Sequence, residues 1–448
     1  MRLDRRRFLH GPPALALLGA AALAGLTGPE PALAARVGTN LPAPPLNAAR
    51  LATLAEPERS AWAAYLAATA RQLQADRAAL AAERGPGTPV PAPPPSGKSE
   101  ASMPLDRPMA WYGSDDALRV AENIVSFQTP AGGWGKNQAR DQPPRLPGQS
   151  YVANGTSRFA RLDDFDQPAD PAWSYVGTID NDATTTEIRF LALVQAQLPA
   201  QQANAYRASA IRGVQYLLAA QFPGGGWPQV WPLQGGYHDA VTLNDDAMTG
   251  VAALLGEVAR GEAPFAFVPQ PLRAQSAAAE LRAIDKLLAL QVRVNGRPML
   301  WAQQHDALTG APVSARNYEP PGLCASESAG VLLYLMSLDE PSLPVVQAVE
   351  GGIAALRELE LQGVTWGRQA GEADRSLQTQ SGARGLWARF YDTQTLKPVF
   401  GDRDKSLHDD VAGVSAERRN GYAWFVTVPK KALQAHEGWA KRWLRNRP

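Results

Sequence analysis

The chain has 448 residues, a formal net charge of +1 and one cysteine, Cys324. Its 44 Lys and Arg nearly balance 43 Asp and Glu, so it has no electrostatic footprint for nucleic acid or for an acidic membrane surface. A single cysteine excludes an intramolecular disulfide, and stability therefore has to come from packing. A chain of this length can bury a sizeable core, in one large domain with an appendage or in two domains.

The N-terminus has the features of an export signal. Arginines at positions 5–7, then Phe8 and Leu9, precede an apolar run and a small-residue stretch at positions 32–34. The apolar run of roughly 13 residues is shorter than the roughly 20 that span a membrane, so a signal peptide over residues 1–34 is favoured over a stable membrane anchor. The paired arginines resemble a Tat signal, which predicts a bacterial protein exported to the periplasm or the medium.

Two further segments precede the main part of the chain. Within residues 35–84, an alanine-rich pattern with helical spacing from 47 to 84 predicts one long helix or a helical hairpin. Residues 85–102 are rich in Pro, Gly and Ser, which predicts a semi-extended linker. We therefore expect a domain boundary near Ser102 and a main domain over residues 103–448.

Helical periodicity dominates the main domain. The predicted helices cover residues 117–127, 185–197, 203–221, 247–260, 274–291, 326–338 and 345–361. Strand-like alternation is confined to short pieces at 364–366 and 422–427. The predicted class is predominantly all-α.

An imperfect repeat links these helices. In each copy a helix ends in Gln, and a turn that carries a Trp follows. The pairs are Gln128 with Trp134, Gln221 with Trp227 and, more loosely, Gln291 with Trp301 and Gln362 with Trp366. Repeated helix pairs that bury one face against their neighbours predict an (α/α) toroid or barrel, with long loops forming a cleft at one end.

Two oxygen-rich turns each stand directly before a predicted helix. They are Asp180-Asn181-Asp182 and Asn244-Asp245-Asp246. Such clusters suit calcium, which accepts carboxylates, amide carbonyls and water, although the spacing is not that of an EF-hand. The alternative is that Asp182 or Thr184 only caps the following helix.

Capping needs one short polar side chain, whereas each turn offers three. Several carboxylates around one cleft repel one another unless a cation neutralises them. The two turns therefore favour a shared metal site.

Basic and aromatic residues follow in two later loops. Arg316 lies near Tyr318 and Glu319 in a loop braced by prolines at 312, 320 and 321; the alternative for this arginine is a buried salt bridge to Glu319 or Asp306. The later loop supplies Lys397, Arg403, Arg418, Arg419 and Tyr422. These groups can bind carboxylates and stack under sugars, although each is also a common surface residue.

Seven ordered motifs carry a family resemblance. They are GGWGKN, TIDNDATTTEIRFLA, FPGGGWPQVWP, YHDAVTLNDDAM, WAQQHDALTGAPVSARNYE, FYDTQTLKPVFGDRD and RRNGYAWF. Together they resemble the pectate lyases of polysaccharide lyase family ten, from about Met103 to the C-terminus. The N-terminal helix and the linker lie outside the resemblance.

The resemblance implies an (α/α) toroid that binds Ca²⁺ and cleaves polygalacturonate (pectate) by β-elimination, releasing 4,5-unsaturated oligogalacturonates. It implies Arg316 as the catalytic base and Arg403 as a ligand of the substrate carboxylate. Asp182 and Asp245 are the implied calcium ligands, with Asp180 and Asn181 close by. Further substrate contacts are expected from Lys136, Asn137 and Tyr422. We expect a monomer.

Two other functions remain open at this stage. A non-catalytic polyuronate-binding protein would keep the tryptophans and the acidic turns, although the intact Arg316 argues against it. A toroidal glycoside hydrolase would use two carboxylates and give saturated products. A terpene cyclase is least favoured, because it would gain nothing from a secretion signal.

Overall fold

The computed structural model describes residues 35–153 and 163–444. The expected signal peptide, residues 1–34, lies outside the described residues. Helices dominate, and the described strands have two to five residues each. The predominantly all-α class predicted from the sequence is confirmed. No helix among the described residues is long and apolar enough to cross a membrane.

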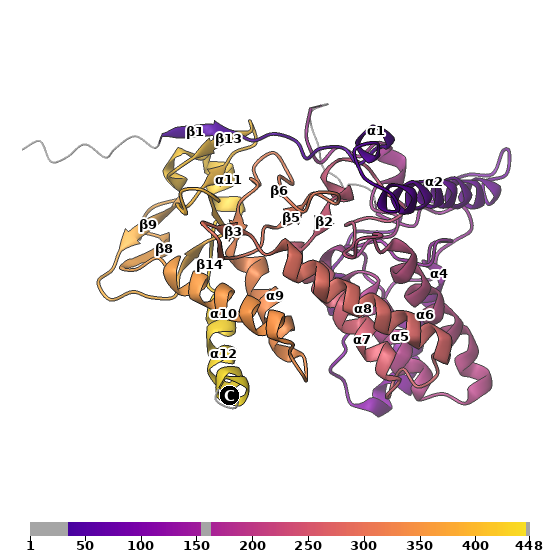
Figure 1. The fold of residues 1–448 in the computed structure, drawn as a ribbon. Coiled ribbons are helices and arrows are strands. Elements are labelled where there is room, and N and C mark those ends of the chain that lie inside the picture. Colours follow the sequence, from indigo (N-terminus) through magenta and orange to yellow (C-terminus); the bar gives the residue numbers. More distant parts are fainter. Residues whose placement is uncertain (1–34, 154–162, 445–448) are drawn as a thin grey trace, which may run out of the picture. The chain divides into compact units, whose positions relative to one another are not determined.

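The principal helices alternate between two layers along the chain. The outer helices are α4 (Asp115–Ser126), α6 (Ala200–Ala220), α8 (Gln270–Leu290) and α10 (Leu343–Glu358). The inner helices are α5 (Thr185–Ala196), α7 (Ala247–Arg260), α9 (Ala325–Ser337) and α12 (Pro429–Trp443). Each inner helix contacts the next inner helix, and each outer helix contacts the next outer helix. This is the (α/α) toroid arrangement that the repeat predicted (Figure 1).

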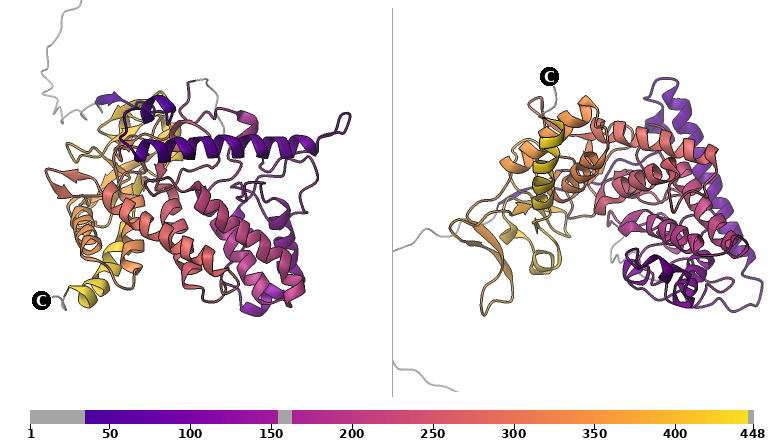
Figure 2. Two further views of the ribbon diagram at one scale, coloured as in Figure 1. Left: turned by 45° about the vertical axis from the view of Figure 1, so that its right-hand side comes forward. Right: turned by 90° about the horizontal axis from the view of Figure 1, so that it is seen from below.

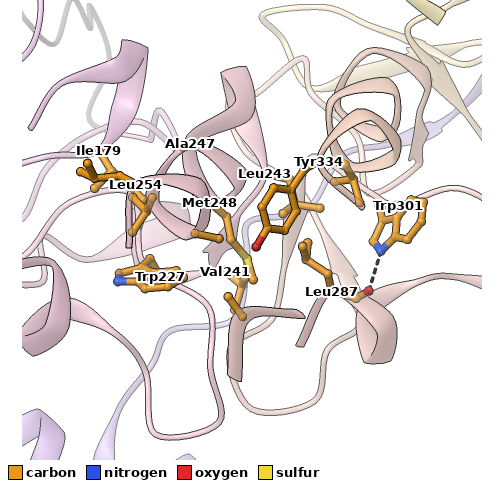
Figure 3. Close-up of a cluster of buried hydrophobic side chains, with 14 of the residues drawn as sticks. Ile179, Trp227, Val241, Leu243, Ala247, Met248, Leu254, Leu287, Trp301 and Tyr334 are labelled. Carbon is orange, nitrogen blue, oxygen red and sulfur yellow. Dashed lines mark hydrogen bonds between the residues drawn. The ribbon is translucent and has the colours of Figure 1, made fainter. Parts of the chain in front are cut away.

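The repeated tryptophan turns close the outer helices. A helix leaves its last carbonyls without intrahelical donors, and an indole N–H can supply one. Four indoles do so at 2.7 Å: Trp134 to Ile124, Trp227 to Leu217, Trp301 to Leu287 and Trp387 to Leu356. The side chains around Trp227 and Trp301 pack with residues of α7 in one apolar cluster (Figure 3). The turns therefore both cap the outer helices and build the core.

The fourth tryptophan corrects the sequence prediction. The expected residue, Trp366, lies instead in β8 (Val364–Arg368), which pairs with β9 (Arg375–Thr379), and its ring packs at 4.7 Å from Phe425. The β8–β9 hairpin separates Gln362 from the turn, so the tryptophan of this repeat comes later, at Trp387.

The repeated glutamines join successive outer helices. Gln128 donates to the carbonyl of Ser209 on α6 at 2.9 Å, and Gln221 to that of Ala279 on α8 at 2.8 Å. Gln291 donates to the carbonyl of Ala348 on α10 at 2.9 Å. The sequence repeat thus encodes both the helix ends and the stacking of one helix pair on the next.

Short antiparallel strands tie the loops together. β2 (Val241–Thr242), β5 (Gln304–His305) and β6 (Pro312–Val313) form one sheet, with Val241 opposite His305. The other pairs are β7 (Leu323–Cys324) with β11 (Phe390–Tyr391), β10 (Trp387–Ala388) with β14 (Phe425–Val426), and β3 (Arg293–Val294) with β4 (Arg297–Pro298). A third sheet orders β1 (Arg36–Thr39), β13 (Ser406–His408) and β12 (Phe400–Gly401).

The remaining elements are short, apart from α2. They are α1 (Ala48–Leu51), α2 (Glu58–Ala82), α3 (Ser99–Ser102), α11 (Ala416–Gly421) and the 3-10 turns η1 (Met109–Gly113), η2 (Pro171–Trp173), η3 (Asp180–Asp182), η4 (Gly236–Asp239), η5 (Asn244–Asp246) and η6 (Val411–Gly413). The segment expected to be one helix or a hairpin is thus a short helix followed by a long one.

The long helix α2 packs against the toroid. Trp62 and Tyr65 are buried against Phe222, with ring centroids 5.1 and 5.3 Å away, and the Tyr65 hydroxyl donates to the carbonyl of Ala220 at 2.9 Å. Figure 2 shows α2 lying across one end of the repeated helices. The described residues form one compact unit, so the part before Ser102 packs on the rest of the chain. The domain boundaries stay predictions.

Substituting the fourth tryptophan tests the repeat. We expect Trp387→Phe to lower the free energy of unfolding by about 1–3 kcal/mol, because Leu356 loses its donor and a small void forms. The matched control is Trp366→Phe, which removes an indole nitrogen that is buried without a partner among the described residues and should cost less. Chemical denaturation measures both, and equal losses would contradict the assignment of Trp387.

Candidate active site

Two turns with the same backbone shape lie side by side at one end of the toroid. In η3, Asn181 and Asp182 have φ of 52° and 58°; in η5, Asp245 and Asp246 have φ of 48° and 58°. Asn and Asp tolerate this left-handed region better than most residues. The structure therefore brings the two predicted acidic turns together.

Neither turn uses its aspartates as helix caps. The N-cap of α5 is Thr184, whose backbone N–H donates to Glu187 Oε2 at 2.8 Å. Asp246 occupies the N-cap position of α7 without a side-chain hydrogen bond to the helix. Of the two candidate caps, Thr184 holds the position, and the carboxylate of Asp182 is left exposed beside α7.

A cavity of about 430 Å³ lies beside these turns. Seven of the predicted site residues line it: Lys136, Asn137, Asp180, Asn181, Asp245, Arg316 and Arg403. Asp182 and Tyr422 are not among the described residues that line it. The cavity thus has acidic turns on one side and arginine-bearing loops on another.

A hydrogen-bonded chain runs along the cavity from one basic group to the other. Lys136 pairs with Asp180, and Asn244 Nδ2 donates to Asp180 Oδ1 at 3.0 Å. Gln303 Nε2 donates to Asn244 Oδ1 and, at 3.4 Å, to Glu319 Oε1. Glu319 in turn holds Arg316. Two neutral amides therefore connect two buried ion pairs.

Lys136 determines the charge of Asp180. Burial opposes the charged carboxylate, but Lys136, together with Gln229 and Arg316, holds the pKa of Asp180 below its ordinary value. The ammonium of Lys136 also lies 3.8 Å from the centre of the Tyr175 ring. Both carboxylate oxygens of Asp180 already have partners, so this predicted calcium ligand is engaged with Lys136 and Asn244.

The carboxylates of Asp245 and Asp246 have no ion pair of the kind that Lys136 makes with Asp180 in the described part of the chain. Burial, together with Asp180 and Glu327, raises the pKa of Asp245 to about 6. Burial, with Glu327, Asp182 and Asp245, raises the pKa of Asp246 to about 6. Both residues nevertheless reach solvent, which screens this repulsion. An exposed, mutually repelling set of oxygen donors fits a hard cation such as Ca²⁺.

Within residues 35–153 and 163–444, no three carboxylate, imidazole or thiol groups converge as a complete metal site. Calcium needs six to eight oxygen ligands, and amide oxygens and waters count among them. The calcium expectation therefore stays a prediction.

Arg316 is held by Glu319 in a bidentate ion pair. Its Nε and Nη2 donate to the two carboxylate oxygens at 2.8 and 2.6 Å, and its backbone N–H donates at 3.0 Å. Burial opposes both charges, but each partner stabilises the other: the pKa of Glu319 falls to about 2, and that of Arg316 rises well above its ordinary value. This is the salt bridge that the sequence offered as an alternative role for Arg316.

Arg403 and Tyr422 differ in their access to the cavity. Arg403 lines it with a side chain that is 55% exposed and pairs with Glu417 at 2.8 Å. The hydroxyl of Tyr422 donates to Glu319 Oε1 at 2.7 Å, so it supports the Arg316 pair from behind. Its expected contact with substrate stays untested, while Asn137 lines the cavity and accepts from Asn181 at 3.0 Å.

Sequence reasoning assigned no role to several residues of this site. Arg389 pairs with Glu327, which lies in the first turn of α9. Tyr175 and Tyr237 line the cavity, and Asp166 accepts from the Tyr237 hydroxyl at 2.6 Å. The position of Glu327 at the start of the next inner helix was an available signal. Tyr237 opens the motif YHDAVTLNDDAM, which was also an available signal, whereas Tyr175 lies outside the seven motifs.

The structure is a helical toroid with a cavity lined by acidic turns and arginine-bearing loops, and comparison with known proteins identifies its family. The family model for pectic acid lyase matches residues 128–433. The chain therefore belongs to the pectic acid lyase family and is a polysaccharide lyase. No curated protein sequence matches it.

Two solved structures from Cellvibrio cellulosa are similar to this chain. A family 10 polysaccharide lyase is 30% identical, with a TM-score of 0.61, covering 77% of this chain and 100% of that one. An Asp-to-Ala mutant of a family 10 polysaccharide lyase, in complex with trigalacturonic acid, is 29% identical with a TM-score of 0.61 and covers 76% and 98%. The family resemblance and the toroid predicted from the sequence are both confirmed.

The raised pKa of Asp246 predicts a pH-dependent stability. A carboxyl group with a folded pKa near 6 binds its proton more tightly when folded, so it lowers stability as pH rises from about 4 to 6. In excess chelator, Asp246→Asn should raise the melting temperature by roughly 1–3 °C at pH 8 and leave it unchanged at pH 4. The control Asp285→Asn changes an exposed residue of α8 and should leave the melting temperature unchanged at both pH values.

Proposed function

We propose that this lyase cleaves α-1,4-polygalacturonate by β-elimination and releases 4,5-unsaturated oligogalacturonates. The observation that carries the proposal is the cavity in which two acidic turns face loops bearing Arg316 and Arg403. A polyuronate has a carboxylate on each sugar, and arginine binds carboxylates bidentately. The complex of the related Cellvibrio lyase with trigalacturonic acid supports the same substrate class.

The proposed reaction removes the proton on carbon five of a uronate. The electron pair of that C–H bond forms the double bond between carbons four and five, and the bond from carbon four to the glycosidic oxygen breaks. We assign proton removal to Arg316, which lines the cavity with a side chain that is 37% exposed. Water supplies the proton that completes the leaving hydroxyl. Arg403 and Lys136 hold substrate carboxylates.

The proposed cofactor is Ca²⁺. Asp245, Asn181 and Asp182 would hold it, since they are exposed oxygen donors on the paired turns. Asp180 would contribute only by giving up its pair with Lys136. When bound, the ion neutralises the substrate carboxylate and so stabilises the charge that develops as the proton leaves.

Arg316 can act as a base only in its neutral form. The pair with Glu319 favours the charged guanidinium and raises the pKa of Arg316 well above its ordinary value. Catalysis by this route therefore requires the bound cation and neighbouring basic side chains to offset the charge of Glu319. It also requires alkaline conditions, which increase the neutral fraction.

The proposal extends to the whole chain. Residues 1–34 would serve as a Tat-like signal peptide that directs the enzyme to the periplasm or the medium. Residues 35–84 would be an N-terminal helical segment and residues 85–102 a linker, followed by the catalytic domain, residues 103–448, in a monomer. An enzyme outside the cell would meet pectate directly.

Ultraviolet absorbance of the unsaturated product tests the reaction and the cofactor together. We expect absorbance to rise when the protein is mixed with polygalacturonate and calcium, and turnover to stop in excess chelator. The melting temperature should change little with chelator, because the proposed ion links the substrate to the loops and does not link one helix to another. Full turnover in chelator would refute the calcium role, and saturated reducing products would indicate a hydrolase.

Substitution of Arg316 tests its assignment as the base. Arg316→Lys keeps a positive charge but displaces the nitrogen from the proton, and such misplacement can cost roughly a hundredfold or more in turnover. We expect that loss, with affinity for trigalacturonate kept within several-fold and a folded protein by circular dichroism. If a tenth or more of the turnover remains, Arg316 is not the base.

Glu319→Gln complements this test. It keeps one of the two acceptor oxygens, replaces the other by an NH₂ group, and removes the charge that raises the pKa of Arg316. If Arg316 is the base, the alkaline rise in turnover should move to lower pH, because less alkali is then needed to form the neutral guanidine. An unshifted profile with reduced turnover would indicate that Arg316 acts as a cation.

A further inference from the structure

The N-terminal strap, residues 35–50, crosses both loops that carry the arginines of the cavity. Its strand β1 pairs with β13, with Thr39 opposite Ser406, and the backbone N–H of Asn40 donates to the carbonyl of Lys405 at 2.7 Å. Figure 1 shows β1 against β13, from opposite ends of the sequence. The strap lies before the region that matches the family, residues 128–433.

Asn40 of the strap reaches the Arg316 loop, and the carbonyl of the adjacent Leu41 accepts a hydrogen bond from the Ser314 hydroxyl of the same loop. Asn40 is 2% exposed, and its Nδ2 donates to the carbonyls of Arg316, Asn317 and Glu319 at 3.3, 3.0 and 3.1 Å. Three carbonyl oxygens facing one group require that group to be the NH₂ end of the amide, whose two protons they share. The amide oxygen could not replace it without facing three other oxygens.

The three carbonyls belong to the turn that forms the Arg316–Glu319 pair. In that turn the Glu319 N–H donates to the carbonyl of Arg316 at 2.8 Å, and the Ala315 N–H to that of Glu319 at 3.2 Å. Asn40 therefore binds the same carbonyls that close the turn. The turn is buried, so its carbonyls cannot bind water freely. The NH₂ group of Asn40 supplies hydrogen bonds to these carbonyls in place of water.

The Arg316 loop and the Arg403 loop contact each other directly, and the strap contacts both. Asn317 Nδ2 donates to the carbonyl of Arg403 at 3.0 Å, and a Cβ at Gly401 would collide with the carbonyl of Tyr318. Asn40 contacts both loops, one through its side chain and the other through its backbone N–H. A shift of Asn40 would thus move the two arginines relative to each other.

We propose that Asn40 is a positioning residue that fixes the position of the Arg316 loop relative to the Arg403 loop at the cavity. The inference rests on the proposed function, because it assigns Asn40 an effect on turnover through Arg316. It gives the strap a role in catalysis, although no strap residue is among the described residues that line the cavity. It further implies that removing the strap would leave the family domain with misplaced arginines.

The test compares Asn40→Ala and Asn40→Asp with Val37→Ala, a control on the same strap whose side chain is 56% exposed. Turnover and KM on polygalacturonate are measured, together with hydrogen exchange of the backbone amides. A local effect accelerates exchange in residues 313–319 alone. A general loss of stability also accelerates exchange of the amides of α7, which serve as the reference.

We expect Asn40→Ala to lower kcat by roughly tenfold to a hundredfold, with KM within threefold, since displacement of a catalytic group acts mainly on the chemical step. Exchange should accelerate in residues 313–319 and not in α7. Asn40→Asp should lose at least as much, because a carboxylate cannot donate to the three carbonyls. Val37→Ala should match the wild type.

Turnover within twofold of wild type in Asn40→Ala, full activity in Asn40→Asp, or faster exchange in α7 as well would each overturn the inference. The proposed role of Arg316 is tested separately: it is refuted if the Arg316→Lys variant keeps a tenth or more of the turnover. In that case the exchange result still decides whether Asn40 holds the loop, because it does not depend on which group is the base.

Discussion

Two buried carboxylates, those of Asp180 and Glu319, impose the central constraint on this protein. A buried charge is costly unless it is paired and hydrogen-bonded. Lys136 and Arg316 supply the pairing, and Asn244 and Gln303 bridge between the two pairs. Because these residues come from three connections between helices, α4–α5, α6–α7 and α8–α9, satisfying the two carboxylates fixes how the loops meet around the cavity.

The repeated turns make that meeting possible. Each of the four tryptophans caps an outer helix, and Gln128, Gln221 and Gln291 each join one outer helix to the next. The inner helices then begin in neighbouring positions, which places η3 beside η5 and their exposed carboxylates together. The chemistry of the cavity is therefore a consequence of a repeat whose own residues are buried in the core.

The same pairing gives the resting site its electrostatic character. Asp180 and Glu319 are satisfied, whereas Asp245 and Asp246 repel their neighbours. This combination of exposed acidic turns and nearby arginines is the basis of the proposed binding of Ca²⁺ and polygalacturonate. The pair with Glu319 favours the charged guanidinium, so the proposed mechanism requires that balance to change before Arg316 accepts a proton.

The sequence alone determined the helical class, the repeat and seven of the residues that line the cavity, because helical periodicity and the Gln and Trp turns are local in the chain. It could not distinguish Asp180 from Asp245, since both stand in acidic turns, and only the tertiary structure pairs one of them with Lys136. The same holds for Trp387 in place of Trp366 and for Asn40, whose partners lie more than 270 residues away. Contacts between distant segments depend on packing, and no local pattern records them.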